Sequence, residues 1–306
     1  MGLELNVFDI EKDWLDKNLF IGGIKEELKE LIDYLGKTKK ASEITRVSYD
    51  CIKEALLGRA PINLKKLSII LNSVPEGLKE KTIQKIKNKK TSYSVQKSNK
   101  KIFFPAALNE NLAYIIGVIL GDGHLHSNKN NKKGNWTICV YFDNYCHMKK
   151  YNKIIKNEIG IKAKINKEKN CFNCYFCSKA IHWFFMSFFK LVNGAKFDKI
   201  IIPKRIIDSK NRKIINSCIQ GLFDSDGTVT KRYAGFSSTS KKIVNQVHLI
   251  LEKQGISPKK HKWLKNKKYK MLYSTRIGNK EGIKKFQKKI GFRHPVKKER
   301  LNTLLN

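Results

Sequence analysis

Apolar residues near the start of the chain recur at the three- and four-residue spacing of amphipathic helices. The spacing predicts one helix over 24–35, stopped by Gly36, and a second over Tyr49–Leu57. A third helix is predicted over Asn63–Leu71. We therefore expect the chain to begin with a small all-α domain.

A tight turn precedes Ser48, a residue suited to N-capping the second of these helices. Short helices joined in this way are similar to a helix-turn-helix, whose second helix enters the major groove of DNA. Tyr49 and Lys53 on that helix are therefore candidate DNA contacts. Cys51 and Ile52 could equally be core residues of a helical cap that touches no DNA.

Residues 85–101 contain seven lysines, no acid and only two aliphatic side chains. This composition predicts a basic linker over 85–104, following an N-terminal domain over 1–84. The linker could be a solvated tether, or a strap that lies along phosphates.

An internal repeat with an offset of 104 residues organises the remaining chain, and it places Asp122 opposite Asp226. In the first copy we expect strands over 136–142, 161–167 and 171–177, a helix ending at Gly160 and a closing helix over 181–191. In the second copy we expect strands over 233–237, 260–264 and 269–277, a helix capped by Ser240 and a closing helix over 283–290. The order α-β-β-α-β-β-α, found twice, predicts an α+β fold of two pseudo-symmetric half-domains, 105–208 and 209–306.

The repeated helix is unusual for a helix at a protein surface. Residues 113–120 are apolar around the whole circumference, which predicts burial on all sides. Gly117 and Gly121, like Gly221 and Ser225, are small residues four apart, and this spacing lets two helix backbones approach closely. Each helix ends in Asp-Gly, where the glycine is expected to supply the C-cap.

The net charge of +37 indicates a polyanionic partner. The first 35 residues hold nine acids and four lysines, a local charge of −5, so the remaining 59 basic and 17 acidic residues give +42. Nucleic acid suits this charge better than an anionic membrane surface. No apolar run approaches the roughly 18 residues that a membrane span needs.

Asp122 and Asp226 fall at helix C-termini, where a carboxylate faces the negative end of the helix dipole. Two such carboxylates side by side also repel each other. Bound divalent cations and an opposing phosphodiester would offset both effects. The pair therefore suits Mg²⁺ and hydrolysis by metal-activated water.

On these residues, the region 105–306 resembles the LAGLIDADG homing endonucleases in their single-chain, two-motif form. The resemblance implies that the two motif helices form the interface between half-domains, and that Asp122 and Asp226 coordinate the catalytic metal. The first copy has Leu120 where the motif has an earlier acid, whereas the second keeps Asp224. The sheets would form a saddle on double-stranded DNA, with alternate residues facing the major groove.

The resemblance further implies a Lys or Gln near the scissile phosphate at the end of the second strand of each repeat, but neither 142–144 nor 238–240 contains a Lys. Lys204, and Lys297 or Lys298, are the candidate catalytic substitutes. Candidate DNA contacts are basic and aromatic residues of the strands: Lys132, Lys133, Trp136, Lys162, Lys164 and Lys167 in the first copy, and Lys231, Arg232, Tyr233, Lys260, Lys262, Trp263 and Arg276 in the second. With this many cations, DNA affinity should fall steeply with salt.

Two further patterns admit a ligand interpretation. Cys171, Cys174 and Cys177 have metal-site spacing, but no fourth ligand has convincing spacing and small apolar residues also suit a strand. His124 and His126 flank the first Asp-Gly and could meet phosphate, or simply occupy the top of a strand.

The odd number of cysteines, seven, and an acidic N-terminus unlike a signal peptide predict reduced thiols in a cytoplasmic protein. Endonucleases of the resembled family often sit inside inteins. Here Met1 supplies no splicing nucleophile and Asn306 is not preceded by His, so we expect a free-standing protein.

The sequence thus predicts a monomeric, Mg²⁺-dependent, site-specific double-strand DNA endonuclease. A non-catalytic DNA-binding transcriptional regulator and an RNA maturase that assists intron splicing stay open as alternatives. The net charge cannot separate the three functions, because each needs a polyanion.

Overall fold

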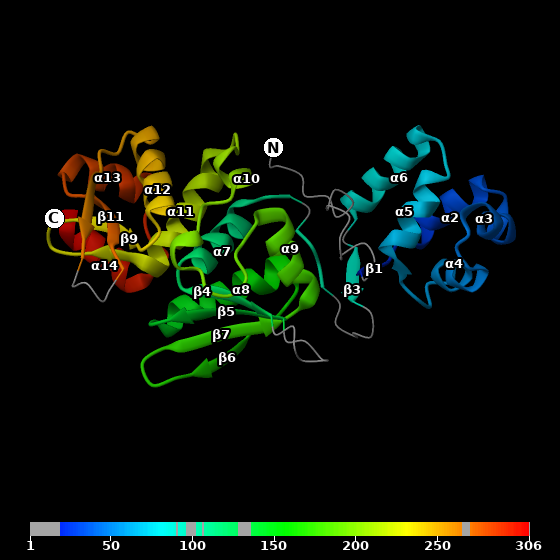
Figure 1. Cartoon of the computed structure of the whole chain (residues 1–306), viewed down its shortest axis with the longest axis horizontal. Helices are drawn as coiled ribbons and strands as arrows, with labels where there is room; N and C mark the ends of the chain where they lie inside the picture. The colour runs from blue at the N-terminus through cyan, green and yellow to red at the C-terminus, as the bar shows by residue number, and fades with distance from the viewer. Residues whose placement is uncertain are drawn as a thin grey trace.

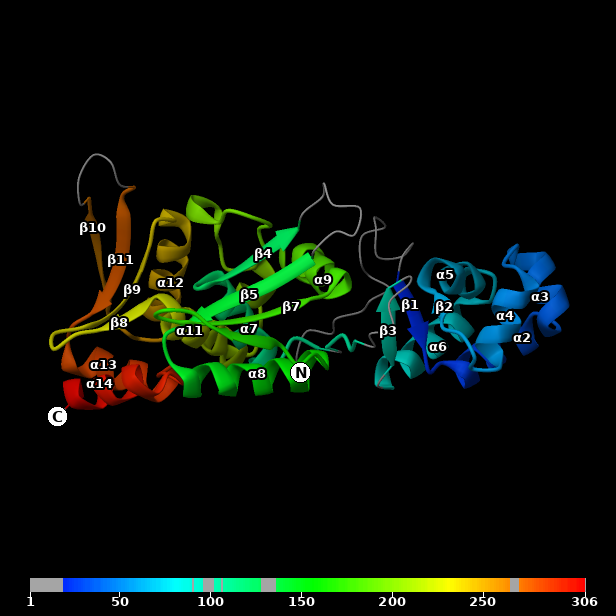
Figure 2. The same cartoon turned by 90° about the horizontal axis from the view of Figure 1, so that it is seen from below.

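The computed structural model describes residues 19–89, 91–95, 102–105, 107–127, 136–264 and 270–305. The N-terminal unit lies at one end of the molecule and the second half-domain at the other, with the first half-domain between them (Figures 1 and 2).

The N-terminal unit is mainly helical, as predicted, but it is not all-α. Its helices are α2 (Lys25–Tyr34), α3 (Lys37–Thr45), α4 (Tyr49–Leu56), α5 (Leu64–Asn72) and α6 (Glu76–Asn88). Strands β1 (Leu19–Gly22), β2 (Ile62–Asn63) and β3 (Ser92–Val95) form an antiparallel sheet in the order β2-β1-β3. Strands of two to four residues carry too little alternation to be recognised in the sequence.

Part of the predicted basic linker belongs to this unit, because α6 extends to Asn88 and β3 pairs with β1. The lysines of α6 complement the acidic helix α2. The Lys85 ammonium lies 2.7 Å from Glu30, and Lys89, just after α6, lies 3.1 Å from Glu27. Some lysines of the predicted linker therefore form ion pairs with acids about sixty residues earlier in the same chain.

A short turn separates α3 from α4, at the place where the sequence predicts a tight turn. Three residues separate the helices, and the first of them, Arg46, has a left-handed backbone with φ 56°. Val47 is buried, and its carbonyl accepts a hydrogen bond from Ser42 Oγ at 2.7 Å. Ser48 occupies the N-cap position, although its side chain makes no capping hydrogen bond.

The two half-domains repeat the predicted order α-β-β-α-β-β-α. The first contains α7 (Glu110–Leu120), β4 (Gly123–Ser127), β5 (Trp136–Phe142), α8 (Tyr145–Ile159), β6 (Lys164–Lys167), β7 (Phe172–Cys177) and α9 (Lys179–Phe189). The second contains α11 (Arg212–Asp226), β8 (Gly227–Val229), β9 (Ala234–Ser238), α12 (Lys241–Lys253), β10 (Lys259–Trp263), β11 (Leu272–Ile277) and α13 (Lys280–Lys289). The antiparallel sheets have matching orders, β4-β5-β7-β6 and β8-β9-β11-β10. The sequence did not predict α10 (Lys204–Ile207), the short 3₁₀ helix η2 (Phe197–Lys199) or α14 (Pro295–Leu305).

Helices α7 and α11 pack backbone to backbone at the centre of the half-domains. A Cβ added to Gly117 would overlap the carbonyl oxygen of Cys218, and one added to Gly221 would lie 2.8 Å from Val118 N. A Cβ on Gly121 would overlap the side chain of Ser225. The predicted role of the small residues is therefore confirmed, because no larger side chain fits between these helices.

The glycines of the two Asp-Gly pairs do not act as left-handed C-caps. Gly227 has φ −76° and ψ 151°, an extended backbone, and it begins strand β8. A Cβ there would lie 2.7 Å from Phe223 Cα, and one on Gly123 would lie 2.6 Å from Ile119 Cα. Both positions need glycine because the chain turns directly from the helix into a strand that passes over the helix end.

Gly117→Ala should destabilise the paired half-domains by about 3 kcal/mol or more, because the added methyl group meets backbone that cannot rotate away. Gly278→Ala is the matched control, since its Cβ would make only an ordinary contact of 3.6 Å, and we expect a change below about 1 kcal/mol. Urea denaturation followed by tryptophan fluorescence measures both. Equal midpoints for the two variants would contradict the close helix contact.

Candidate functional site

The close packing of α7 and α11 places Asp122 and Asp226 beside each other. Asp122 follows the last turn of α7, and Asp226 is the last residue of α11. The Oδ2 atom of Asp226 lies 3.5 Å from the position that a Cβ on Gly121 would occupy. The two acids of the repeat therefore meet at one end of the helix pair, between the two sheets.

Both carboxyl groups hold protons more tightly than an ordinary aspartate. Burial, followed by the negative charge of Asp122, raises the pKa of Asp226 to about 6. The pKa of Asp122 is also raised, chiefly by partial desolvation, although its side chain still reaches solvent. A carboxylate pair that is costly to ionise gains from any cation bound between its members.

Two lysines cap the ends of the motif helices. The Lys297 ammonium donates to the carbonyl oxygens of Phe223 at 3.2 Å, Asp224 at 2.7 Å and Ser225 at 2.6 Å. The Lys196 ammonium donates to the equivalent carbonyls of α7 and the residue after it, which belong to Ile119, Leu120 and Gly121. In each half, the three N–H groups of one lysine thus match three carbonyls that the helix leaves without partners.

These caps offset the unfavourable placement of an acid at a helix C-terminus, because they put a positive charge at the negative end of the dipole. Both lysines lower the pKa of Asp122 and of Asp226. Burial lowers the pKa of Lys196 to about 8, and it also lowers the pKa of Lys297. Four interacting charged groups therefore form one electrostatic unit.

Of the two predicted lysines, the structure places Lys297 beside the acids but not Lys204. In the first half, Lys196 takes the position that the sequence analysis gave to Lys204. Lys204 begins the short helix α10 and is exposed. Lys196 follows the end of α9 by seven residues, and Lys297 follows the end of α13 by eight. This similar spacing after the closing helix of each half could have identified Lys196 from the sequence. Lys204, in the short helix α10, lies farther from the closing helix and was the wrong choice.

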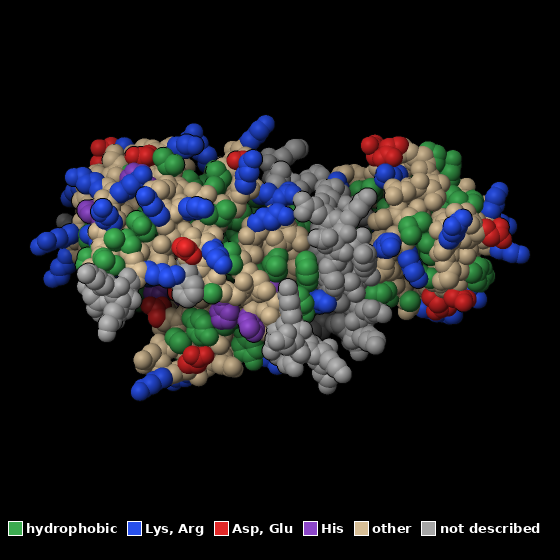
Figure 3. Space-filling model, in the orientation of Figure 1, with side chains coloured by type: hydrophobic (Ala, Val, Ile, Leu, Met, Phe, Trp, Pro, Cys, Tyr) green, Lys and Arg blue, Asp and Glu red, His purple; other side chains and the backbone are tan. Residues whose placement is uncertain are grey.

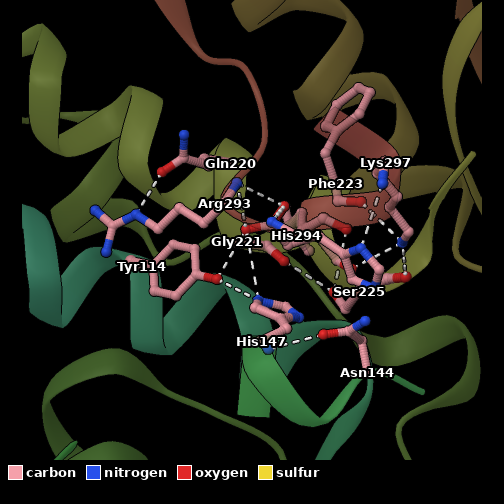
Figure 4. Close-up of polar contacts among 12 residues, drawn as sticks. Tyr114, Asn144, His147, Gln220, Gly221, Phe223, Ser225, Arg293, His294 and Lys297 are labelled. Atoms are coloured by element: carbon pink, nitrogen blue, oxygen red, sulfur yellow. Dashed lines mark hydrogen bonds and ion pairs between the residues drawn. The ribbon is translucent and has the colours of Figure 1, made fainter. Parts of the chain in front are cut away.

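A polar network that draws on both half-domains surrounds Asp224, two residues before Asp226, and Figure 4 shows part of it. The buried carboxylate of Asp224 accepts hydrogen bonds from the Tyr114 hydroxyl at 2.8 Å and from the backbone N–H groups of Arg293 and His294, at 3.1 and 3.0 Å to Oδ1. The Tyr114 hydroxyl also contacts His147 Nε2 at 2.7 Å, and the Arg293 guanidinium lies 4.1 Å from the Tyr114 ring. The equivalent of Asp224 in the first half is Leu120, so the two halves differ in what surrounds the acids.

The register of the first sheet separates two faces. Ile138, Val140 and Phe142 are buried on the face that packs against helices, and Phe142 contacts Tyr151 of α8. The opposite face carries mainly neutral polar and aromatic side chains. It comprises His124, His126, Thr137, Cys139, Tyr141, Lys164, Asn166, Asn173, Tyr175 and Cys177, which pair across the strands.

Several predicted contacts of the first copy do not lie on this outward face. Trp136 is on the helix side, where its ring contacts His182 and Trp183 of α9. Lys167 pairs with Phe172 on the same side. Lys162 precedes β6 and is exposed, whereas Lys132 and Lys133 lie outside the described residues.

In the second sheet, the outward face is more cationic. Arg276 pairs with Gly235 and Lys259, and its guanidinium lies 4.7 Å from the Tyr233 ring. His261 and Trp263 share this face, and Trp263 is 57% exposed.

Two other lysines of this sheet point the opposite way, because they alternate with the outward residues of β10. Lys260 pairs with buried Thr275, and Lys262 pairs with Tyr273. Lys231 and Arg232 are exposed in the turn between β8 and β9.

The remaining sequence candidates are also placed by the structure. Tyr49 and Lys53 are exposed on α4, with the Lys53 ammonium 5.8 Å from the Tyr49 ring. His124 stacks on Tyr141 with 6.0 Å between ring centroids, and burial lowers its pKa. Within the described part of the chain, no three His, Cys, Asp or Glu side chains lie close enough together to hold a metal ion. Cys171, Cys174 and Cys177 therefore do not form such a group.

Lys and Arg side chains spread over the half-domains in the face that Figure 3 shows. Among the described residues, no helix is long and apolar enough to cross a membrane.

Comparison with known proteins identifies the fold. Residues 213–291 match the family model of the LAGLIDADG-like domain. Together with the repeated architecture, this match shows that the chain has a LAGLIDADG homing endonuclease-like fold. The homing endonuclease I-DmoI, solved in complex with DNA and Mn, is similar in structure with a TM-score of 0.47 and 19% identity, over 60% of this chain and 97% of that one.

Two curated relatives come from Methanocaldococcus jannaschii. The chain is 27% identical over 214 residues to a glutamine--fructose-6-phosphate aminotransferase, which covers 66% of this chain and 18% of that protein. It is 28% identical over 204 residues to a replication factor C small subunit, covering 65% of this chain and 10% of that protein. The chain thus spans less than a fifth of the length of either relative.

Asp226→Asn should stabilise the protein at pH 8 but not at pH 4. The native pKa near 6 lies above the ordinary value of 3.8, so the wild type loses stability as pH rises from about 4 to 6 and the carboxylate ionises in the fold. Asparagine avoids this loss, which is on the order of 3 kcal/mol. Urea denaturation in EDTA at the two pH values measures the difference, with the exposed Asp208→Asn as control. An equal effect at both pH values would contradict the raised pKa.

Proposed function

We propose that the protein is a site-specific double-strand DNA endonuclease that uses divalent metal ions, and that it acts as a monomer. The observation that carries the proposal is the acid pair at the meeting point of α7 and α11, each acid having a lysine on its helix end. A close pair of partly desolvated like charges is unfavourable in a merely structural interface. It suits a centre that receives cations and a phosphodiester.

Asp122 and Asp226 fit a Mg²⁺ site because Mg²⁺ commonly takes one or two carboxylates and completes its shell with water and substrate phosphate. Desolvation raises the pKa of both acids, and the charge of Asp122 adds to the effect at Asp226, so a bound cation would offset the cost of ionising them. The bound ion would supply Lewis-acid polarisation of the scissile phosphodiester. In this proposal, the two acids hold the cations, one for each DNA strand.

Lys196 and Lys297 keep positive charge beside the acids, where the negative charge of a reacting phosphodiester would increase. Because each ammonium is fixed by backbone carbonyls, its orientation is set before DNA binds. The outward faces of the two sheets would bind the major groove on either side of the cut. Helix α4, with Tyr49 and Lys53 exposed, would add a further DNA contact.

The comparisons supply independent support. I-DmoI is described in complexes with DNA and Mn and with DNA and Ca. The chain is also similar to a small part of an aminotransferase and to a small part of a replication factor C subunit. This pattern supports the view that its fold is a module that occurs within different proteins.

Cleavage of a randomised plasmid library tests the activity. We expect double-strand cuts at one sequence with Mg²⁺ and none with EDTA. Asp122→Asn/Asp226→Asn should lower the rate at least about 100-fold, since the acids hold the cations on which the reaction depends.

Full cleavage by the double variant would show that these acids are not the metal ligands. Specific DNA binding without cutting would instead favour the transcriptional regulator. The absence of both would make intron RNA the next ligand to assay.

The register of β10 and β11 predicts which basic residues read sequence. Arg276→Ala should weaken binding to the selected site by about 10- to 100-fold while changing scrambled DNA little, because Arg276 lies on the outward face. Lys262→Ala, the matched loss of one charge on the other face, should weaken both DNAs alike and only slightly. Competition binding at fixed salt distinguishes the two. Equal loss of specificity in both variants would contradict the assigned faces.

A further inference from the structure

His294 links the first turn of α14, which contains Lys297, to the opposite half-domain. Its ring lies just before α14, and its Nδ1 accepts a hydrogen bond from the Lys297 backbone N–H at 3.3 Å. The accepting role leaves the proton on Nε2, which donates to Asp143 Oδ1 at 2.8 Å. Asp143 belongs to the first half-domain, in the turn between β5 and α8. One hydrogen-bonded chain therefore runs from the first half-domain to the backbone of Lys297.

The turn at Arg293 and His294, just before α14, is also fixed from its other side. Asp224 accepts hydrogen bonds from the backbone of Arg293 and His294, and the Arg293 side chain donates to Gln220 Oε1 at 2.7 Å. These contacts stay within the second half-domain, so they hold the turn on α11. Asp143 provides the contact that joins the first half-domain directly to the His294 ring, and its side chain is 73% exposed.

The loop that contains Lys196, between α9 and η2, is held differently. Gly194 N–H donates to the Leu125 carbonyl at 2.7 Å, and Asn193 Nδ2 donates to Ser127 Oγ at 2.7 Å. Both partners belong to β4 of the same half-domain. A change in how the half-domains pack together would therefore disturb the start of α14, which contains Lys297. The loop that contains Lys196 would stay attached to its own sheet.

We propose that Asp143 is a positioning residue for the second half-site: through His294 it aligns Lys297, so that cleavage of one DNA strand depends on the contact between half-domains. The inference rests on the proposed nuclease function and deepens it. Asp143 need not touch DNA or metal for this role. It acts on the helix end that carries Lys297, and therefore on only one of the two acid–lysine pairs.

The test compares cleavage rates of the two strands of an end-labelled duplex that contains the selected site. Lys297→Ala and Lys196→Ala first identify the strand that depends on each lysine. Asp143→Ala should slow the Lys297-dependent strand about 10-fold, the effect of losing one hydrogen bond to a charged group, and the other strand less than about 2-fold. Nicked DNA should accumulate as a result.

Asp143→Asn keeps an oxygen acceptor for His294 and should restore the strand ratio to within about 3-fold of the wild type. Asp208→Ala removes one exposed acid at the end of α10 and controls for net charge. Melting temperature and binding of the uncut duplex in EDTA show whether each variant is folded, and general destabilisation would slow both strands together.

A wild-type strand ratio in a folded Asp143→Ala variant would overturn the inference while leaving the nuclease function intact. Equal slowing of both strands in a variant that melts and binds like the wild type would also overturn it, because Asp143 would then act on the whole site. A wild type that cuts neither strand would remove the proposed function, and the inference with it.

Discussion

The contact between the backbones of α7 and α11 determines the rest of the site. Gly117 and Gly221 lie where any side chain would meet the opposite helix, so the helices approach until main-chain atoms touch. This approach brings Asp122 and Asp226 to one point and fixes the two sheets on either side of it. Because two packed helices of this kind behave as one rigid element, the spacing of the acids is set by steric contact rather than by mobile loops.

The placement of the acids creates an electrostatic problem that the fold only partly solves. Lys196 and Lys297 neutralise the helix ends, yet the pKa of Asp226 stays near 6, so burial and repulsion outweigh the nearby ammonium groups. In the proposed function, bound cations would supply the compensation that the site's own residues leave incomplete. The same imbalance makes the native state less stable above the pKa of Asp226, which links stability to the proposed activity.

The two halves share topology but differ in the chemistry around the acids. The first has a face of neutral polar and aromatic residues and a lysine-bearing loop tied to its own sheet, whereas the second has Arg276, Lys259 and Trp263 on its outward face. The network around Asp224 and His294 joins residues of both halves but surrounds the second acid, and Leu120 stands where a matching acid would be in the first half. A pseudo-symmetric frame therefore supports an asymmetric site, as expected of a single chain whose halves can change independently.

The sequence by itself determined the repeat, the order of its elements and the pairing of Asp122 with Asp226, because small residues four apart and a fixed offset are local patterns. Local patterns also located α2, α4 and α5, since the apolar spacing of each helix lies within about ten residues. The strands β1 and β3 escaped notice because they are short and pair across some seventy residues.

Only the tertiary structure decided that Lys196 rather than Lys204 reaches the acids, and that Lys262 and Trp136 face away from the outward surface of the sheets. It alone joined Asp143 to His294 across 151 residues of sequence. The physical reason is common to these cases. A side chain's partner depends on strand register and on how separate elements fold back together, and neither is encoded in the spacing of neighbouring residues.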